Sequence, residues 1–557
     1  MPATLGSADT RNLPLERLIL ALVVLGTLGR IVFVWNASIL DLLQRSTDDA
    51  YYYFNVAENI VEGFGVTFDR INPTNGFHPL WMLCLLPVST LAGHDRDTAL
   101  RAIFSLVALI TGGGVWAAYK TISLYASRTA ALFGVGLLFV PVFLNSFLNG
   151  LETGLLLLLL FGAAYAISRY DLLSPVATRS EDLALGALLA LIVLCRLDAI
   201  FVACAIIAGL WVRWWTCADR RIGVVSVAWK TLRVSLLPIG TVGAYLLWNV
   251  AMFGHASPIS GAVKSTFPIS TFTWSRLVDP HRMYGEAQLL LTACGFLWLG
   301  PRRRQWTAVA SSDPRQKAAQ ILVALWVGSL AHLLYSTLYM DWAAHWWHFA
   351  SYTPMTIITA ALVFDGECAR SRRPAFATVA GTIGLVAVIG LGSYVDVRTR
   401  GAHHRPWYDA SMWARANLPE NAVIGMTDAG LFSYFSRRRT VNLDGVINGY
   451  DYQQALRDHR LAEYLKSSGV THIADYEVRY RNGTYTIRLP ARLYRQRGGA
   501  IATTQTAEIY GGIPYPELFG PDDIHFAIWD LDRLRIIDDV SRAARENGIG
   551  REAEGTR

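Results

Sequence analysis

The sequence has little charge and few cysteines for its length. Charged residues make up 17% of the 557 positions, whereas 53% are hydrophobic, and the mean hydropathy is +0.30. The six cysteines form no CxxC pair and none follows Cys368, which argues against a zinc site and leaves the last third of the chain without a disulfide framework. A chain this apolar is not expected to be soluble, so we expect an integral membrane protein.

The sequence also lacks the patterns of nucleotide-binding and nucleic-acid-binding proteins. The glycine-containing segment at residues 427–450 holds neither a GxGxxG nor a P-loop pattern. The formal net charge of +7 comes mostly from arginine and lysine that flank apolar runs, and no basic stripe lies on a soluble domain. We therefore exclude nucleic acid as a partner.

What the sequence does have is a series of apolar runs, and a helix needs about 20 mostly apolar residues to cross a bilayer. Eleven runs are predicted to cross, although several are short. They lie at about Leu18–Ala37, Ala102–Tyr119, Ala130–Leu148, Gly154–Ile167, Leu183–Leu194, Ala199–Trp214, Val234–Phe253, Ala287–Leu299, Ala318–Leu338, Trp346–Phe364 and Phe376–Val395. The first run has no cleavage pattern behind it and is predicted to be an anchor.

A twelfth apolar stretch, Pro79–Ala92, is about 14 residues long and is predicted to lie at the interface without crossing. With a cytoplasmic N-terminus, this choice leaves every basic cluster on the cytoplasmic side, as the positive-inside rule requires. The prediction is a multi-pass protein of the cell membrane, with residues 1–397 as the membrane domain and residues 398–557 as a soluble domain on the outer face.

The first polar stretch on the outer face contains an acidic pair. Asp48 and Asp49 fall in the first turn of a predicted helix that ends at Gly63 and Gly65, and Tyr52 follows the pair at helical spacing. Such a pair could simply complement the helix dipole. The aromatic neighbours directly after a span favour a site, because a positioned carboxylate can accept the proton of an attacking hydroxyl.

Further polar residues are predicted on the same face. Glu152 stands at the mouth of a span, where an unpaired carboxylate is costly. Arg196 and Asp198 lie at another outer helix end and form either part of the site or a structural ion pair. Lys264, in a later loop, could contact a phosphate or could only reach the interface with its ammonium group.

The aromatic segment Asp341–Met355 opens the tenth run, and its tryptophans suit an interfacial belt. His345 and His348 in this segment could contact phosphate or sugar, and His78, at the end of the first outer stretch, completes the candidate substrate-binding residues. Two histidines without a third spaced ligand make a weak metal site. We therefore assign no cofactor and leave a divalent metal open.

These residues together resemble the GT-C superfamily of membrane glycosyltransferases. The resemblance rests on the Asp-Asp pair with its aromatics, the Gly-x-Gly turn and Pro-Leu-Trp that follow, Gly-Leu-Glu-Thr at Gly150–Thr153, and Arg-Leu-Asp at Arg196–Asp198. It covers roughly Thr47–Met355. The chain is most similar to the dolichyl-phosphate-mannose-mannosyltransferase-like branch, which includes lipid-linked arabinofuranosyltransferases.

The resemblance implies a polyprenyl-phosphate monosaccharide donor, transfer with inversion, and an acceptor hydroxyl on a cell-envelope glycan or lipid reached from outside. It also implies that Asp48 is the base, that Asp49 is its acidic neighbour, and that Lys264 touches the donor phosphate. The sequence departs from oligosaccharyltransferases because it lacks a WWDYG-type motif, which argues against transfer of whole glycans to asparagine.

After Val395 the pattern changes to short β-type segments. Strands are predicted at Ala422–Met426, Thr440–Leu443, Val470–Ala474, Tyr485–Leu489 and Phe526–Leu531, with a helix at Asp451–Leu465. This mixture indicates a C-terminal α/β or α+β domain.

Other functions stay open on the sequence alone. Within the same class, the acceptor could be a protein serine or threonine. A transporter or flippase of lipid-linked sugar would bind its substrate at mid-membrane between repeated halves, and no internal repeat is evident. A scaffolding membrane protein would need none of the outer-face acids.

Overall fold

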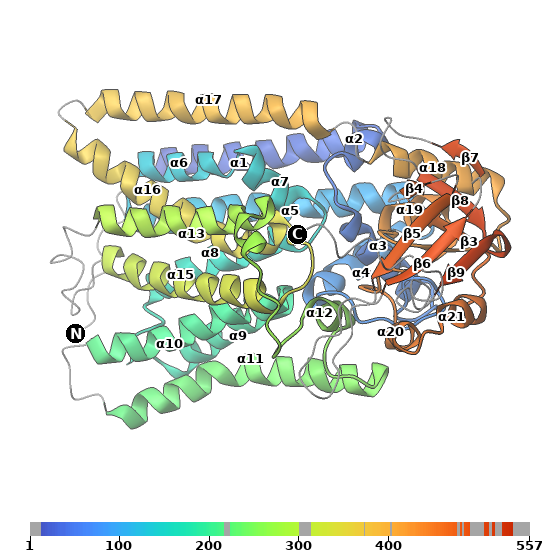
Figure 1. Cartoon of the computed structure of the whole chain (residues 1–557). Helices are drawn as coiled ribbons and strands as arrows, with labels where there is room; N and C mark the ends of the chain where they lie inside the picture. The colour runs from blue at the N-terminus through green and yellow to red at the C-terminus, as the bar shows by residue number, and fades with distance from the viewer. Residues whose placement is uncertain are drawn as a thin grey trace, which may run out of the picture.

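The computed structural model describes most of the chain between residues 13 and 537. The described residues are 13–175, 177–216, 223–299, 314–371, 374–400, 404–475, 479–481, 484–490, 506–511, 515–518 and 526–537. Long helices run side by side through most of the molecule, and a region of strands and short helices covers one end of them (Figure 1). The predicted class, a helical polytopic protein with a C-terminal mixed domain, is confirmed.

The long helices coincide with the predicted apolar runs. They are α1 (Leu13–Asn36), α5 (Arg96–Tyr125), α8 (Thr153–Tyr170), α9 (Arg179–Cys195), α10 (Ile200–Thr216), α11 (Val224–Phe253), α13 (Pro280–Leu299), α15 (Pro314–Tyr339), α16 (Thr353–Arg370) and α17 (Pro374–Arg400). The run at Ala130–Leu148 forms two helices, α6 (Arg128–Leu137) and α7 (Pro141–Leu148), bent by 70°. Pro141 explains the break, because proline removes a backbone donor and favours a first helical turn.

Six helices in the described part of the chain are long and apolar enough to cross a membrane, and the bent pair makes a seventh if it counts as one span. The six are α1, α5, α8, α10, α11 and α15. The chain is therefore a multi-pass membrane protein. The helices α9, α13, α16 and α17 do not pass the same test, so the remaining four of the eleven crossings stay predictions.

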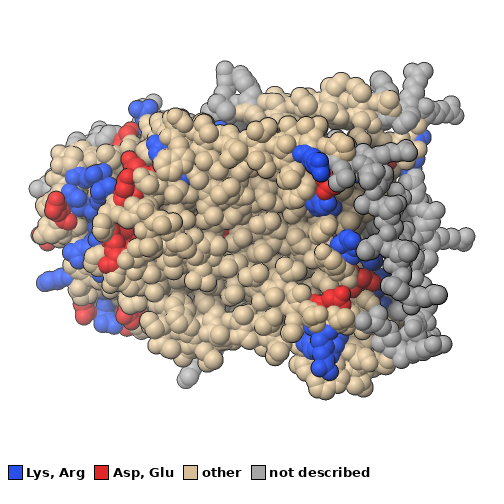
Figure 2. Space-filling model, turned by 180° about the vertical axis from the view of Figure 1, so that it is seen from behind, with Lys and Arg blue, Asp and Glu red and all other residues tan. Residues whose placement is uncertain are grey.

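The outer surface of the helices is apolar. Leu25 of α1 is 63% exposed, Leu247 of α11 is 72% exposed, and Leu391 of α17 is 68% exposed. Figure 2 shows acidic and basic side chains gathered toward the two ends of one face, with a broad band of other residues between them. Soluble proteins rarely expose so large an apolar area, so this band is the lipid-facing belt.

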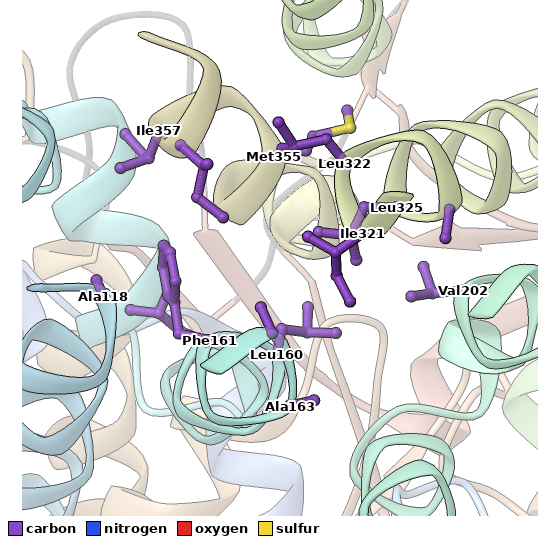
Figure 3. Close-up of a cluster of buried hydrophobic side chains, with 14 of the residues drawn as sticks. Ala118, Leu160, Phe161, Ala163, Val202, Ile321, Leu322, Leu325, Met355 and Ile357 are labelled. Atoms are coloured by element: carbon purple, nitrogen blue, oxygen red, sulfur yellow. The ribbon is translucent and has the colours of Figure 1, made fainter. Parts of the chain in front are cut away.

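Apolar side chains also fill the space between the helices. Figure 3 shows part of this core, where α8, α10, α15 and α16 meet; the labelled residues include Leu160, Phe161, Val202, Ile321, Leu325 and Met355. The helices α10 and α15 approach closely at Gly328, where an added Cβ would lie only 2.7 Å from the Cα of Val202. A glycine is required here, and the two helices it brings together border the site described below.

One end of the bundle gathers the polar stretches predicted for the outer face. The helices α3 (Asp48–Val61), α4 (Pro79–Ala92) and α12 (Ile259–Lys264) lie at the same end as the C-terminal strands (Figure 1). The helix α4 has the predicted bounds, is 14 residues long, and packs against α3 and α5. The candidate residues of several loops are thereby brought to one end of the molecule.

The C-terminal region contains two described sheets. The larger has the strand order β2-β1-β3-β8-β7, with β1 parallel to β2 and β3, and β8 antiparallel to β3 and β7. Its strands are β1 (Val423–Met426), β2 (Arg439–Asn442), β3 (His472–Asp475), β7 (Tyr515–Leu518) and β8 (Phe526–Asp530). The smaller sheet is antiparallel, in the order β4-β5-β6-β9, from β4 (Arg479–Arg481), β5 (Thr484–Pro490), β6 (Thr506–Gly511) and β9 (Leu534–Ile537).

Four short helices accompany the larger sheet: α18 (Arg405–Asn417), α19 (Gly430–Ser436), α20 (Tyr450–Arg457) and α21 (Leu461–Ser467). The single helix predicted at Asp451–Leu465 is therefore wrong, since the chain breaks it into α20 and α21. The left-handed backbone of His459, at φ +56°, interrupts the helix between them. The helix α19 follows β1 after a three-residue turn, which positions its first turn against α3.

Candidate active site

The helix α3 carries the acidic pair in its first turn. Thr47 occupies the N-cap with an extended backbone, and Asp48 and Asp49 are the first helical residues, where negative charge complements the helix dipole. Gly63 and Gly65 follow the helix with φ angles of +84° and +82° and allow the chain to turn away. Consecutive residues of an α-helix point about 100° apart, so the two carboxylates face different surroundings.

Asp48 faces the C-terminal domain. Its Oδ1 accepts the backbone N–H of Leu431 at 2.7 Å and its Oδ2 accepts that of Gly430 at 3.0 Å, both in the first turn of α19. Burial raises the pKa of this carboxyl well above its ordinary value and the charge of Asp428 adds to the rise, while the N–H of Leu431 opposes it. Both oxygens are therefore engaged by α19, and Asp48 does not line the cavity that holds the other candidates.

Tyr52, one turn further along α3, extends this contact. Its hydroxyl donates to Asp444 Oδ2 at 3.0 Å and accepts the backbone N–H of Ala429 at 3.2 Å. The same Asp444 oxygen accepts a hydrogen bond from Asn442 Nδ2 at 2.9 Å. The face of α3 toward the C-terminal domain is thus fixed by hydrogen bonds to residues that lie almost four hundred positions later.

A cavity of about 440 Å³ lies beside α3, at the ends of several membrane helices. We call it the main cavity. Eight of the ten predicted site residues line it: Asp49, Tyr52, His78, Glu152, Arg196, Asp198, Lys264 and His348. The fold therefore brings together residues that are far apart in the sequence, and Asp48 and His345 are the two candidates outside the cavity.

Asp49 and Lys264 are the two charged groups of the main cavity without an ionic partner in the described part of the chain. Among the residues that the structure describes, none forms a hydrogen bond or an ion pair with the half-buried Asp49 carboxylate. The Lys264 ammonium lies 5.6 Å from the ring centroid of Trp342, and no described carboxylate lies within 4.0 Å of it. One acidic and one basic group are therefore available to a bound molecule.

Arg196, in contrast, is fully paired. Its Nη1 lies 2.6 Å from Glu152 Oε1, and its Nε and Nη2 donate to the two oxygens of Asp198 at 3.1 and 2.7 Å. Arg196 and Glu152 are both buried, so the pair satisfies two charges that would be costly alone. The second oxygen of Glu152 is buried without a hydrogen-bond partner among the described residues, so this cavity residue keeps one unused acceptor.

Two histidines adjoin this ion-pair network. His78 Nε2 lies 3.8 Å from Glu152 Oε1, and its Nδ1 accepts the backbone N–H of Leu197 at 3.4 Å. His332 Nε2 lies 3.7 Å from Asp198 Oδ2, and its Nδ1 shares a hydrogen bond of 2.9 Å with the Tyr352 hydroxyl. Both rings are held in fixed orientations at the wall of the main cavity.

The two histidines of the aromatic segment lie in different surroundings. They belong to the short 3-10 helix η5 (Trp346–Tyr352) and its N-cap. His348 lines the main cavity, whereas the His345 ring stacks on Trp347 at 4.3 Å outside it. His345 contributes its backbone N–H, which donates to His348 Nδ1 at 3.1 Å. Within the described ranges, no group of three His, Cys, Asp or Glu side chains is arranged to hold a metal ion.

The surroundings shift the proton affinities of the cavity groups. Burial raises the pKa of the Asp49 carboxyl, and the attraction of Lys264 opposes that rise. Burial also lowers the pKa of His78 and, more strongly, that of His348. At neutral pH these imidazoles are therefore uncharged, and Asp49 holds a proton more tightly than an exposed aspartate does.

His332 and Tyr53 are among the polar residues of the main cavity that sequence reasoning missed. His332 lies in the middle of an apolar run and no motif surrounds it, although a histidine inside a membrane helix is itself a signal. Tyr53 follows Tyr52 directly and was not among the candidates. Its hydroxyl accepts the backbone N–H of His78 at 3.1 Å. The first of these signals was readable from the sequence.

Comparisons with known proteins support the fold. Residues 396–512 match a family described as "Domain of unknown function (DUF8728)". No functionally curated protein matches the chain by sequence. The structure of ArnT from Cupriavidus metallidurans bound to undecaprenyl phosphate is 13% identical, covers 82% of this chain and 93% of that one, and superposes with a TM-score of 0.50.

Archaeal oligosaccharyltransferases from Archaeoglobus fulgidus are also similar. One, tethered with an acceptor peptide, is 12% identical, covers 83% of this chain and 69% of its own, and has a TM-score of 0.49. Another, AglB in complex with an inhibitory peptide and a dolichol-phosphate, is 14% identical with the same coverage and a TM-score of 0.46. At these identities the likeness to ArnT shows the fold alone: the chain has a GT-C fold.

Proposed function

We propose that this protein is a glycosyltransferase that moves a monosaccharide from a polyprenyl-phosphate carrier to an acceptor hydroxyl at the outer face of the membrane. The observation that carries the proposal is that Asp49 and Lys264 line the same cavity, and that neither has an ionic partner among the described residues. The reaction needs one group to accept a proton and another to stabilise a leaving phosphate, and these two residues supply both.

The wall of the main cavity supports a lipid-linked donor. Ile200 and Phe201 of α10 and Tyr335 of α15 line it, and both helices are long and apolar enough to cross a membrane. Ile200 is also 41% exposed. A donor could therefore keep its prenyl chain in the lipid while its phosphate reaches Lys264. ArnT, whose fold this chain shares, binds undecaprenyl phosphate.

In the proposed reaction the Asp49 carboxylate removes the proton from the acceptor hydroxyl as its oxygen attacks the anomeric carbon. The bond between that carbon and the phosphate oxygen breaks, and the phosphate leaves with the electron pair. Lys264 stabilises the charge that develops on it. Attack from the side opposite the phosphate inverts the anomeric centre. The raised pKa of Asp49 makes this carboxylate a stronger base than an exposed aspartate.

The remaining polar residues suit binding of the sugar. Glu152 has one buried carboxylate oxygen free among the described residues, which can accept a hydroxyl hydrogen bond. The neutral imidazoles of His78 and His348 can each donate or accept. Arg196 and Asp198 hold Glu152 and His332 in place. This assignment moves the role of base from Asp48, which the resemblance implied, to Asp49.

The proposal is tested with the purified full-length protein, a panel of polyprenyl-phosphate sugars, and glycan, lipid and serine- or threonine-containing peptide acceptors. Release of the carrier phosphate is scored for the wild type and for Asp49→Asn, with Asp48→Asn as the matched neighbour. We expect one donor class to be cleaved, and Asp49→Asn to slow that cleavage roughly 100- to 10,000-fold. Movement of donor across vesicles without cleavage would instead indicate a flippase and overturn the proposal.

A further inference from the structure

A second, polar cavity of about 200 Å³ lies further along α3, between this helix and the C-terminal domain. Three consecutive arginines from the C-terminal domain, Arg437, Arg438 and Arg439, contribute to its lining, so we call it the arginine cavity. Glu58 and Glu62 of α3 line its other side. The proposed reaction uses none of these residues.

Each of the three carboxylates of the arginine cavity already has partners of its own. Glu58 accepts the Arg96 guanidinium at 2.8 Å, and Glu62 binds Arg70 at 2.5 Å and His94 at 2.8 Å. Asp69, the third acid, accepts three hydrogen bonds from the backbone and side chain of the turn that follows it. The acids of this cavity are therefore not available to the three consecutive arginines.

Those arginines form no ion pair among the described residues, although the charge of Arg437 attracts Asp95. Arg437 and Arg439 are exposed and have no carboxylate within 4.0 Å among the residues that the structure describes. Arg438 Nη2 donates to the backbone carbonyls of Arg415 and Leu418, while its buried Nε has no hydrogen-bond partner in the same described part. Guanidinium groups are charged at every physiological pH and match phosphate and carboxylate with paired hydrogen bonds.

We propose that the arginine cavity binds an oxyanion, a phosphate or carboxylate group, that the acceptor carries away from its reacting hydroxyl. Glu58 lies nine residues after Asp49 on the same helix, which is about 14 Å along the axis. That separation is too long for one sugar ring and suits an extended anionic glycan or glycolipid head group. This reading of the ligand as an acceptor rests on the proposed function, whereas the oxyanion site itself does not.

The first experiment measures binding of inorganic phosphate by titration calorimetry to the full-length protein. It is done in the Lys264→Gln variant, so that the main cavity does not contribute. Adding Arg437→Gln and Arg439→Gln should weaken phosphate binding at least tenfold, and Arg439→Gln alone should weaken it by a smaller factor. Arg460→Gln, which removes an exposed arginine paired with Asp458 at 2.9 Å, is the control and should change nothing.

Equal phosphate affinity in all of these variants would overturn the oxyanion site. Asp49→Asn does not enter this measurement, so a failure of the proposed reaction leaves its outcome unaffected. Arg438 is kept, because its hydrogen bonds to Arg415 and Leu418 support the fold. An unchanged melting temperature in each variant excludes loss of folding as the cause of any lost binding.

The second experiment asks whether the oxyanion belongs to the acceptor. It compares two acceptors that differ only in a remote phosphate or carboxylate group. Each acceptor is tested with the wild-type protein and with the Arg437→Gln/Arg439→Gln double variant, and both proteins keep Lys264. The double variant should raise KM for the anionic acceptor about tenfold, with kcat and the KM of the neutral acceptor unchanged. Lost phosphate binding with an unchanged KM would show that a free anion occupies the site, and would overturn the acceptor assignment.

Discussion

The Asp48 carboxylate accepts the backbone N–H of Leu431 at 2.7 Å, across the boundary between the membrane helices and the C-terminal domain. Asp49, the next residue, faces the main cavity instead. One acid therefore holds α3 against α19, and the other is presented to the proposed substrates. The two carboxylates should respond differently to the same substitution.

Replacement of Asp48 is expected to affect stability. Asp48→Ala removes the acceptor of two backbone N–H groups, and hydrogen bonds to charged groups contribute about 1.5–3 kcal/mol. We expect a clear fall in the melting temperature in detergent. Asp49→Ala is the control, because no such hydrogen bond engages that side chain in the described residues. Equal melting temperatures for the two variants would contradict the assignment.

Replacement of Asp49 is expected to affect turnover. Asp49→Asn removes the proposed base and keeps the shape of the side chain, so kcat should fall roughly 100- to 10,000-fold. Binding of the donor should change little, since the neutral amide still fills the same volume. Single-turnover assays with a radiolabelled donor measure both quantities, and a kcat within a factor of three of wild type would remove Asp49 from the mechanism.

The pH dependence of kcat/KM should report the raised pKa of Asp49. Below that pKa the carboxyl is protonated and cannot accept a proton. The enzyme should therefore be fully active above the pKa and should lose activity as the pH falls through it. The acid limb should lie above the ordinary aspartate value of about 3.9. The residual activity of Asp49→Asn should lack this limb. A wild-type profile that stays flat down to about pH 4 would argue against burial of the base.

Replacement of Lys264 should weaken use of the donor. Lys264→Gln removes a charge-assisted contact to phosphate, which corresponds to about 1.5–3 kcal/mol, or roughly a 10- to 150-fold loss in kcat/KM. Lys264→Arg should restore part of the activity because it keeps the charge. Initial rates at varied donor concentration test both variants. Full activity of Lys264→Gln would show that the phosphate is held elsewhere.

The pair between Glu152 and Arg196 should be needed for folding. Glu152→Ala leaves a buried guanidinium with only Asp198 as partner, and breaking a buried ion pair typically costs about 3–5 kcal/mol. Glu367→Ala, which breaks an exposed pair with Arg370, is the matched control and should leave the melting temperature unchanged. Similar melting temperatures for both variants would mean that the buried network contributes little.

Much of this arrangement is predictable from the sequence because each membrane crossing moves the chain to the opposite side of the bilayer. The predicted side of each loop therefore follows from the number of crossings before it. Glu152, Arg196 and Lys264 lie far apart in the chain, yet each stands at a predicted outer end of an apolar run, and the main cavity unites them. The helix α4 has the bounds predicted for the apolar stretch Pro79–Ala92, which is too short to cross a bilayer.

The parts that could not be predicted depend on tertiary contacts. The sequence places Asp48 and Asp49 in one helical turn, but only the docking of α19 decides which of them faces the cavity. The helix at Asp451–Leu465 is broken by a left-handed residue, His459, which carries no glycine or proline signal. Four of the eleven predicted crossings stay predictions, because the helices that form them are short or more polar.

The hydrogen bond between α3 and α19 joins residues separated by 383 positions. At a synthesis rate of about 5–20 residues per second, the first helices emerge roughly 20 to 80 seconds before their partner. During that interval α3 has no α19 to orient it, so the site cannot be assembled as the chain enters the membrane. A nascent chain halted before residue 430 would be inserted in the bilayer and yet lack a correctly aimed Asp49.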